Sequence, residues 1–466
     1  MGLMGIRGRL GAILGIAAVM LAWAGASHAE TIEGALILAY QNNPQLNAQR
    51  AAVRANDETV PQALSGYRPR ISLSGSVAEQ YSDSLTATPG SRPLELSGWN
   101  APRSVGGTIN QTLFNGFQTA NRTRSAESGV SASREGLRVL EQTVLLAAAT
   151  IYMDYLRDSA IVEVQRSNVR VLEQTLKQTQ DRFNVGEVTR TDVAQSQAQL
   201  AAGRSQALTA ESNLTTTRAN FRRIIGIEPG ALAPGSPVDR LLPRTLAGAV
   251  DAGLIENPNV TAAMFGIDVA FLNVKVNEGA LFPTLQGVVS VTQAYDTTLI
   301  ARRSLTASVG AQLTVPVYQG GSEYSLIRQS KETLAQQRLN LDQVRDQARA
   351  AVVQAWGQLE AARAQVASAQ SQVTASETAL NGVREEARVG QRTTLDVLNA
   401  QQALVNARVA LVTAQHDRVV ASYSVLAAVG RLSPKVLGLS TVIYDPSVHY
   451  HQVRDAWGGV RTPDGH

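Results

Sequence analysis

The sequence predicts an α + membrane β protein built from two internal repeats, each consisting of a helix, two strands and two very long helices. Three observations predict this fold. Short motifs recur in the two halves at nearly constant spacing, two long stretches (103–228 and 317–433) contain no proline, and four segments alternate small polar with apolar residues. A fixed order of recurring motifs is the sequence signature of an internally duplicated architecture.

The N-terminal segment 1–29 is expected to be a signal peptide. Arg7 and Arg9 precede an apolar run over 10–24, and the small residues before the end of the segment allow cleavage after Ala29. A membrane helix is the alternative, but the run is shorter than the ~20 apolar residues of a span, and we find no second such run. Export of the chain is therefore expected.

The motif pairs define the two repeats. The segment 185–193, VGEVTRTDV, recurs as VGQRTTLDV at 389–397, a shift of 204 residues, and Gly116 recurs with the same shift at Gly320. The Asn-Pro pairs and the prolines before the strands recur with a shift of 214, so the first half has ten extra residues between Pro69 and Gly116. We expect this excess to form a loop, where insertions are tolerated.

These offsets set the expected domain boundaries. The first repeat is expected over 30–227 and the second over 245–433. They are joined by a Pro/Gly-rich linker over 228–244, which begins EPGALAPGSP, and are followed by a tail over 434–466. Clusters of Pro and Gly punctuate regular structure, which places the linker between the halves.

The long helices are expected at about 118–183, 189–225, 320–388 and 393–431. In the first of them Leu137, Leu140, Val144 and further apolar residues step by three or four positions, as in the seam of a coiled coil. At ~1.5 Å per residue this helix would be roughly 100 Å long. Aromatic residues make up only 5% of the chain, while Ala and Gln are abundant, a composition that favours long, closely paired helices.

The strands are expected at about 69–82, 103–115, 283–295 and 303–317. Their alternation fits a membrane barrel with a wet interior, although a half-buried soluble sheet gives the same pattern. The membrane interpretation is favoured because the runs approach the ~9–11 residues of a spanning strand and because aromatic residues gather at the strand–helix junctions. These aromatics are Tyr67, Phe114, Phe117, Phe282 and Tyr318. Four strands cannot close a barrel and lipid does not tolerate open edges, so several chains must share one barrel.

Composition and motifs exclude several classes of function. The chain has no cysteine, which excludes disulfides, thiolate metal sites, a Cys nucleophile and a lipid-anchored N-terminal Cys. The formal net charge is only +4 and no basic stripe occurs, so nucleic acid is not an expected partner. We find no Gly-rich phosphate loop, no Gly-x-Ser-x-Gly and no zinc-spaced histidines. No catalytic residue, metal or cofactor is therefore expected.

Taken together, these residues resemble the TolC-like outer membrane efflux family. The most specific matches are the duplicated segments RFNVGEVTRTDV (182–193) and ARVGQRTTLDV (387–397), and the resemblance covers about 30–432. It implies a homotrimer with a 12-stranded β-barrel in the outer membrane, continuing into a long α-helical barrel in the periplasm. It also implies a passive exit duct of a tripartite efflux or type I secretion system. Its partners would be a periplasmic adaptor and an inner membrane pump of RND or ABC type, and its substrates drugs, toxins or proteins. The alternative is a pore-less structural coiled-coil or adhesin protein of the cell envelope.

The two recurring segments are expected to be helical turns at the same end of the molecule. After Val185, Gly186 can take the left-handed position that ends a helix, and Thr189 stands three residues before Asp192, the spacing of an N-terminal capping pair. Val389, Gly390 and Thr393 repeat this arrangement ahead of Asp396. Residue chemistry alone thus explains both motifs as capped turns.

The resemblance adds a gate and a docking site at these turns. It implies that Asp396 forms an acidic ring at the periplasmic mouth. A second acidic position of the family is Asn399 here, so cation binding at the mouth is expected to be weaker. Arg392 matches a gate arginine that reaches the first-half turn of a neighbouring protomer, at Thr191 and Asp192. Ala387 replaces a tyrosine that also locks the mouth. The two turns would also dock the adaptor, and the gate would open when adaptor and pump engage.

The C-terminal tail over 434–466 carries the only other conspicuous motif, His449-Tyr450-His451. Two histidines so close together suggest a metal pair, but no pattern of carboxylates accompanies them. We expect a solvated tail or a segment packed against the helices, with Trp457 holding it in place.

Overall fold

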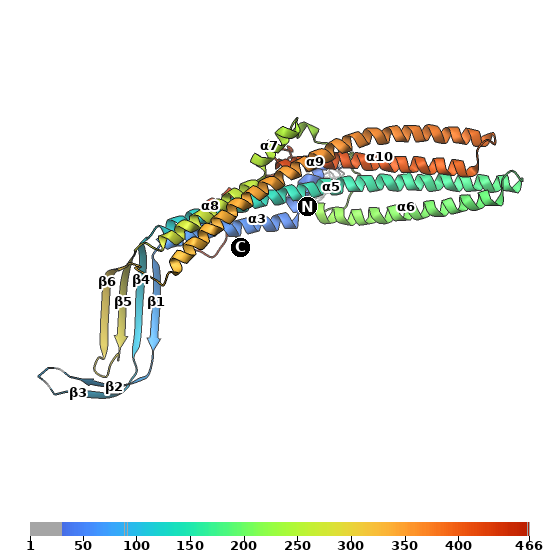
Figure 1. The fold of residues 1–466 in the computed structure, drawn as a ribbon. Helices are drawn as coiled ribbons and strands as arrows, with labels where there is room; N and C mark the ends of the chain where they lie inside the picture. The colour runs from blue at the N-terminus through green and yellow to red at the C-terminus, as the bar shows by residue number, and fades with distance from the viewer. Residues whose placement is uncertain (1–29, 88, 91, 464, 466) are drawn as a thin grey trace, which may run out of the picture. The chain divides into compact units, whose positions relative to one another are not determined.

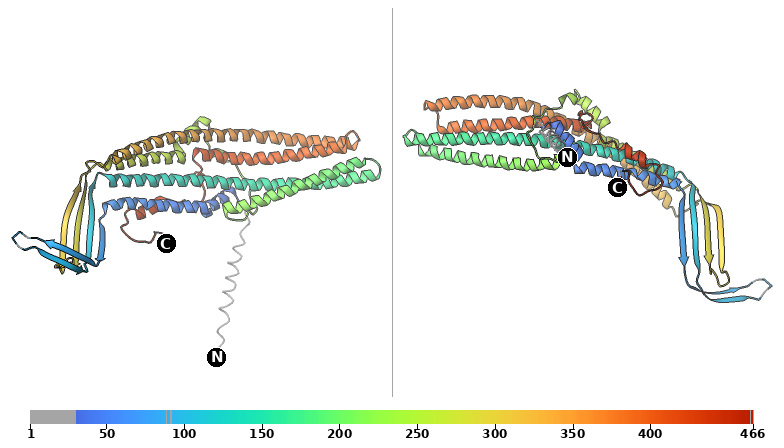
Figure 2. Two further views of the ribbon diagram at one scale, coloured as in Figure 1. Left: turned by 60° about the horizontal axis from the view of Figure 1, so that its bottom comes forward. Right: turned by 180° about the vertical axis from the view of Figure 1, so that it is seen from behind.

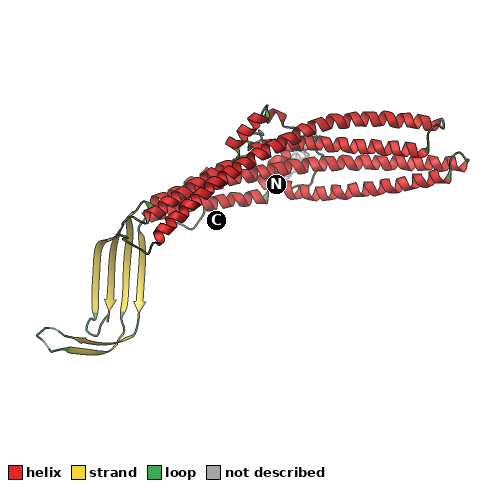
Figure 3. Ribbon diagram, viewed as in Figure 1, coloured by secondary structure: helices red, strands yellow, loops and turns green. Residues whose placement is uncertain are grey.

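The computed structural model describes residues 30–87, 89–90, 92–463 and 465, so the expected signal peptide over 1–29 lies outside the described residues. The chain forms two compact units. The first, here called the tip unit, comprises among the described residues 30–44, Glu141–Ala249 and Val352–Val442. The second, here called the sheet unit, comprises Gln45–Leu140, Val250–Ala351 and Ile443–His466. Figure 1 colours the elements along the chain, and Figure 3 separates helices from strands.

The long helices of the two halves have matching lengths. Helices α5 (Gln118–Asn184) and α9 (Ser322–Arg388) each have 67 residues, and α6 (Arg190–Ile225) and α10 (Thr394–Val429) each have 36. No proline interrupts them, and proline is the residue that most strongly breaks a helix interior. Equal lengths in both halves are the structural counterpart of the 204-residue offset.

The single helix expected before the strands of each half is in fact divided at a proline. In the first half α2 (Ile32–Asn42) is followed by α3 (Pro44–Asp57), α4 (Thr59–Leu64) and the 3-10 turn η1 (Ser65–Tyr67). In the second half α7 (Leu246–Glu256) is followed by α8 (Pro258–Gly279), after the short turn η2 (Asp239–Leu241) in the linker. Asn43 and Asn257 are both extended, because proline drives the preceding residue out of the helical region.

One helical stretch of the described residues, 246–279, is long and apolar enough to cross a membrane, with a mean hydropathy of 1.2. It passes that test only as a whole, since the break at Asn257 divides it into helices of 11 and 22 residues. Helix α8 packs against α9, with Val260 in one cluster and Val274 in another. We therefore interpret the stretch as two separate helices, the second of which packs against α9, rather than as a span.

The sheet unit contains an antiparallel sheet of four strands in the order β1-β4-β5-β6. The strands are β1 (Arg70–Val77), β4 (Arg103–Asn115), β5 (Thr284–Tyr295) and β6 (Arg303–Thr314). One face is lined by hydroxyl and amide groups, with Ser76 bonded to Ser104 and Ser290 bonded to Ser308, each at 2.8 Å. The other face is apolar. This alternation is the one expected from the sequence, and it leaves the edges of β1 and β6 unpaired among the described residues.

Two expected strand boundaries differ in the structure, and proline explains both. The strand expected over 69–82 ends at Val77, because the partner of the next residue, Ala78, is Pro102, which has no N–H to donate. The strand expected over 303–317 ends at Thr314, just before Val315-Pro316.

The segment that holds the ten-residue excess of the first half, expected to be a loop, forms instead a two-stranded ribbon. Strands β2 (Gln80–Thr86) and β3 (Leu94–Asn100) pair with each other and with no other strand. Tyr81 and Trp99 stack edge to face across the ribbon, with ring centroids 5.6 Å apart. The first half therefore has four strands where the second half has two.

An ionic network around the buried side chain of His416 fastens α5 to α10 within the tip unit. The Nε2 atom of His416 lies 2.9 Å from Asp154, and its Nδ1 atom lies 2.8 Å from Asp417. Burial lowers the pKa of His416, but its bonds to the two carboxylates outweigh burial and raise that pKa above its ordinary value. Burial likewise raises the pKa of Asp154, but His416 and Arg157 outweigh it and bring that pKa below the ordinary value. The network is thus held by charge.

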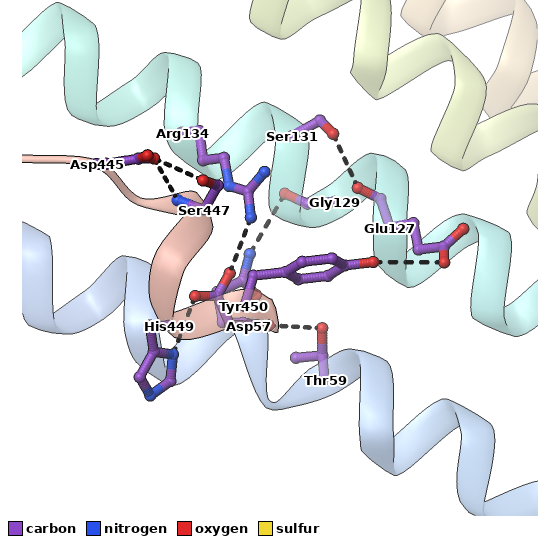
Figure 4. A network of polar contacts seen from close by, with 11 residues as sticks. Asp57, Thr59, Glu127, Gly129, Ser131, Arg134, Asp445, Ser447, His449 and Tyr450 are labelled. Atoms are coloured by element: carbon purple, nitrogen blue, oxygen red, sulfur yellow. Dashed lines mark hydrogen bonds and ion pairs between the residues drawn. The ribbon is translucent and has the colours of Figure 1, made fainter. Parts of the chain in front are cut away.

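The C-terminal tail packs against the sheet unit through the short helix α11 (Ser447–Val453), as Figure 4 shows. The Nδ1 atom of His449 lies 3.1 Å from Oδ2 of Asp57, a carboxylate that is completely buried on α3. Arg134 of α5 lies 3.6 Å from the same carboxylate and stacks on the ring of Tyr450 at 5.0 Å. Of the two expectations for the tail, the packed segment is found. His449 pairs with an aspartate rather than with His451.

The last part of the tail is held by a stacking contact. The guanidinium of Arg68 lies 4.8 Å from the centre of the Trp457 ring, and it also donates a hydrogen bond to the backbone carbonyl of Ala456. Cation–π contacts of this kind contribute about 0.5–1 kcal/mol at exposed sites. Trp457 therefore holds the tail, as the sequence suggested.

Candidate functional site

The turns at the ends of the two long helical hairpins have the same backbone structure. In the first, Gly186 has φ +81°, its N–H bonds to the carbonyl of Phe183 at 3.0 Å, and the next N–H bonds to Arg182 at 2.9 Å. In the second, Gly390 has φ +79° and the same two bonds are present. This pair of bonds with a left-handed glycine is a Schellman ending. It satisfies carbonyl groups that the helix leaves unpaired.

Each turn is followed by a complete capping box. The hydroxyl of Thr189 accepts a hydrogen bond from the N–H of Asp192 at 3.3 Å, and Oδ2 of Asp192 accepts one from the N–H of Thr189 at 2.9 Å. Thr393 and Asp396 make the same reciprocal bonds at 3.3 and 3.0 Å. The Thr-x-x-Asp spacing thus produces in both halves the capped turn that it predicts.

The capping bonds also fix the charge of the two aspartates. Bonds from the hydroxyl and N–H of Thr189 hold the pKa of Asp192 below its ordinary value. Bonds from the N–H and hydroxyl of Thr393 do the same to the pKa of Asp396. Both carboxylates are therefore ionised at neutral pH, each at the positive end of a helix dipole.

The two hairpins lie side by side, so both turns are at the same end of the tip unit (Figure 2). Leu172 of α5, Leu200 of α6 and Leu398 of α10 form one buried apolar cluster between them. Beside this cluster, the amide of Gln199 donates to the amide oxygen of Gln402 at 3.0 Å. The hairpins are thus held together by a small apolar contact and by amide bonds.

The charged residues next to the turns differ between the halves. Arg392 donates to Glu386 at 2.8 Å across the second turn, and this bond raises the pKa of Arg392. At the first turn Arg182 donates to Glu187 at 2.7 Å. Because 182 and 386 are equivalent positions, the helix end is basic in one half and acidic in the other.

The structure does not bring all of the expected gate residues together within one chain. In the part of the chain that the structure describes, Arg392 forms no hydrogen bond or ion pair with Thr191 or Asp192, and its partner is Glu386. Asn399 is exposed one helical turn beyond Asp396. The expected bond between Arg392 and a neighbouring protomer stays a prediction.

Sequence reasoning missed two groups of residues at this end of the unit. One is Glu386, whose only signal was the reversed charge relative to Arg182. The other is a buried amide bridge, in which Gln401 donates to Asn168 at 3.3 Å and accepts from Arg384 at 3.0 Å. A polar residue within an apolar helical seam is the sequence signal for such a bridge. Because this chain has many glutamines, Gln401 could not be distinguished from the others by sequence.

The tips also expose apolar side chains. Val185 and Val389, which precede the two glycines, are 76% and 70% exposed. Phe183 and Leu395 are also exposed. Apolar side chains in exposed turns form a surface suited to contact with another protein. The described residues contain no group of three or more His, Cys, Asp or Glu side chains placed to hold a metal ion.

Comparison with known proteins gives consistent matches. The family model described as outer membrane efflux protein matches residues 36–227 and 249–431, one match for each half. The chain is 42% identical over 444 residues to the outer membrane efflux protein BepC of Brucella suis, covering 94% of each chain. It is 25% identical to the alkaline protease secretion protein AprF of Pseudomonas aeruginosa, covering 82% of this chain and 80% of AprF.

Solved structures show the same fold. The crystal structure of the CmeC outer membrane channel of Campylobacter jejuni superposes with a TM-score of 0.75 at 16% identity, covering 91% of this chain and 89% of CmeC. Helices and strands of the two halves therefore follow the arrangement expected from the sequence.

Proposed function

Because the chain belongs to the outer membrane efflux protein family, we propose that it forms a passive trimeric exit duct of a tripartite efflux or type I secretion system. Proteins of this family are outer membrane channels with a periplasmic helical part, and they are not enzymes. The proposal concerns how many chains form the channel, how its periplasmic end is closed, and what it binds.

The four-stranded sheet is the observation that best supports a trimer. Its four strands have a polar and an apolar face, and the edges of β1 and β6 carry no partner strand among the described residues. In lipid such edges must be paired, so β6 of one chain would pair with β1 of the next. Three chains give twelve strands, within the range of closed outer membrane barrels, whereas two would give the minimum of about eight with little room inside.

The proposed gate is the second-half turn. In a trimer, three copies of Asp396 would form an acidic ring, and Asn399 would leave the next helical turn uncharged. The low pKa of Asp396 supports a permanently charged ring. Arg392 would leave Glu386 of its own chain and bond to Thr191 or Asp192 of a neighbour when the mouth closes. Such a charge-assisted bond at an exposed site is weak enough to yield to a docking partner.

Single-channel recording tests the gate. We expect Arg392→Ala to raise the conductance of the purified channel in planar bilayers, because the contact between chains is lost. Glu386→Gln is the matched control, since it removes the partner within the chain and leaves Arg392 available to a neighbour. If both variants conduct like the wild type, the proposed contact between Arg392 and a neighbouring chain does not close the channel. If Glu386→Gln reproduces Arg392→Ala, the arginine acts only within its own turn.

The exposed turns are also the proposed docking site for a periplasmic adaptor that links the duct to an RND or ABC pump. Gly186→Leu and Gly390→Leu place a bulky side chain in the left-handed conformation, which L-residues other than Gly and Asn avoid, and they change the exposed surface. We expect both variants to lose drug export while still reaching the outer membrane. Gly390→Asn, which tolerates this conformation, is the control. Unaltered drug resistance in the leucine variants would rule out docking at the turns.

The 42% identity to an efflux protein, against 25% to a protease secretion protein, favours efflux as the main role. Deleting the gene and comparing drug sensitivity with the secreted proteome tests this. Increased drug sensitivity with an unchanged secretome is the expected result, and the reverse would assign the duct to protein secretion.

A further inference from the structure

The apolar face of the four-stranded sheet ends in a row of basic residues. The cross-strand pairs Val77–Arg103, Arg103–Tyr295 and Tyr295–Arg303 place one residue of each strand in this last row. Directly paired residues of an antiparallel sheet have their side chains on the same face. The rows beneath it on this face are apolar or glycine apart from one glutamine and consist of Gly75, Val105, Gln293 and Leu305; Leu73, Gly107, Val291 and Ala307; and Ile71, Ile109, Val289 and Val309.

Within the paired rows at this end of the sheet the charged side chains lie on the apolar face, and Asp296 and Arg302 follow in the turn beyond the last row. The neighbouring row on the polar face consists of Ser76, Ser104, Ala294 and Ser304, none of which is charged. If the arginines served only to keep a channel mouth wet, the polar face that lines the channel would carry them. Their place on the lipid-exposed face calls for another explanation.

The two ends of the apolar band also differ. The end next to the helices carries exposed aromatic side chains, among them Tyr67, Phe282 and Tyr318. The far end, where β1 finishes and the chain turns into the ribbon, carries Arg103 and Arg303 beside Tyr295 (Figure 1). With the helices in the periplasm, this far end faces the outer leaflet. The aromatic end next to the helices therefore suits an ordinary membrane–water interface, and the basic far end suits a layer of anionic lipid headgroups.

The basic row is held in a defined arrangement. Nη2 of Arg103 lies 2.9 Å from Oδ2 of Asp296, and its guanidinium lies 6.0 Å from the centre of the Tyr295 ring. Nη1 of Arg302 lies 3.7 Å from the other oxygen of Asp296. The backbone carbonyl of Asp296 is in turn held by Asn100 at 2.8 Å. Two guanidinium groups thus share a single carboxylate, and a positive charge remains.

Arg303 has room to bind a ligand. It makes no ion pair within the residues that the structure describes, and it is exposed. On the other side of Arg103 lies a surface hollow of about 430 Å³. It is lined by Gly75, Ser76, Val77, Arg103, Ser104, Val105 and Tyr295. Strands lie ~4.8 Å apart, so Arg103 and Arg303, two strands apart, have backbones separated by about 10 Å. Two long side chains at this separation can converge on one anionic group.

We propose that Arg103, Tyr295 and Arg303 bind the phosphate of an anionic lipid headgroup in the outer leaflet. A guanidinium presents paired donors that match phosphate oxygens, and its bonds are strengthened at the edge of an apolar band, where the dielectric constant is low. Basic residues that flank a membrane-spanning segment are the usual recognition sites for anionic headgroups. The inference rests on the outer membrane location of the chain and on the membrane barrel of the proposed function, and not on the proposed gate.

The test uses the purified full-length channel reconstituted with a defined lipid. Wild-type and variant proteins are mixed with phosphatidylcholine nanodiscs containing diphosphorylated lipid A, and the lipid A retained after detergent extraction is counted by native mass spectrometry. We expect the Arg103→Gln/Arg303→Gln double variant to retain at least tenfold less lipid A, and each single variant an intermediate amount. Arg70→Gln, on the polar face at the other end of the sheet, should behave like the wild type.

Three results would overturn the proposal. The first is equal retention by the wild type and the double variant, and the second is an equal loss in Arg70→Gln. The third is displacement of lipid A by an equal concentration of inorganic phosphate, which would identify a site for the free ion. Conductance in phosphatidylcholine bilayers separates this proposal from the channel function, because the double variant should conduct normally whether or not it binds lipid A.

Discussion

The duplicated turns provide an internal control that distinguishes a cap from a gate. The perturbation is Thr393→Ala in the second half and Thr189→Ala in the first. Each substitution removes a hydroxyl that accepts the N–H of the third helical residue at 3.3 Å and donates to the carboxylate of that residue, at 2.9 Å in the second half and 2.6 Å in the first. Both threonines are exposed, so the two substitutions remove nearly identical interactions.

Replacing an N-cap threonine by alanine costs ~1 kcal/mol, within a range of about 0.5–2. A loss of ~1 kcal/mol in the stability of the first helical turn means that this turn opens about fivefold more often. We therefore expect about fivefold faster hydrogen exchange at the first amides of α10 in Thr393→Ala and of α6 in Thr189→Ala. The Thr→Ser substitutions, which keep the hydroxyl, should leave the exchange rates unchanged.

The functional readout separates the two turns. If only the second-half turn closes the mouth, Thr393→Ala raises the baseline leak of the channel and Thr189→Ala does not, although both loosen their helices equally. An equal leak in both variants would refute the assignment of the mouth to the Asp396 turn. Unchanged hydrogen exchange in both would refute the energetic reasoning itself, because the capping bonds would then contribute nothing measurable.

Two further predictions concern the buried ionic contacts. Asp57→Ala removes the partner of His449 and leaves Arg134 without its carboxylate. Breaking a buried pair costs about 3–5 kcal/mol, so we expect hydrogen exchange in α11 to rise by at least about 100-fold, at ~1.4 kcal/mol per tenfold change. Asp57→Asn should have a smaller effect, and equal exchange in both variants and the wild type would show that the pair does not hold the tail. The raised pKa of His416 means that its protonated form stabilises the fold below the unfolded pKa of about 6.5 and that this contribution is lost as the pH rises through the folded value. His416→Asn should therefore lower thermal stability at pH 5.5 and have little effect at pH 9, and a loss that is the same at both values would contradict a charged role.

The architecture was predictable because the two halves constrain each other. A capped turn is a weak signal alone, but its recurrence at 204 residues identified both hairpins, and equal helix lengths follow from it. The ribbon of β2 and β3 was not predictable in this way, since the second half, which is ten residues shorter in this segment, has no counterpart of it. Its signal was local. Tyr81 and Trp99 stand at positions that pair across a hairpin, and Pro102 ends the preceding ladder.

The site was predictable only in its backbone. Gly186 and Gly390 have no side chain, and their left-handed conformation follows from sequence spacing alone. The partner of Arg392 was not predictable, because an exposed arginine can reach many carboxylates and the choice depends on helix rotation. Glu386 lies within the same turn and is therefore the nearest carboxylate in a single chain. A contact between chains has to compete with it, which makes the strength of the proposed gate depend on this local pair.

The same comparison shows how one duplicated element can acquire two roles. The turn itself depends on Gly, Thr and Asp, and these are identical in the two halves. What differs is the charge next to the turn, where Arg182, Asn184, Glu187, Val188 and Arg190 in the first half correspond to Glu386, Arg388, Gln391, Arg392 and Thr394 in the second. The backbone geometry is indistinguishable at the two glycines, so any difference in function between the turns has to come from these side chains. Exchanging the charged residues between the halves, with Gly, Thr and Asp unchanged, should therefore move the leak-sensitive position from one turn to the other, and conductance would show whether it does.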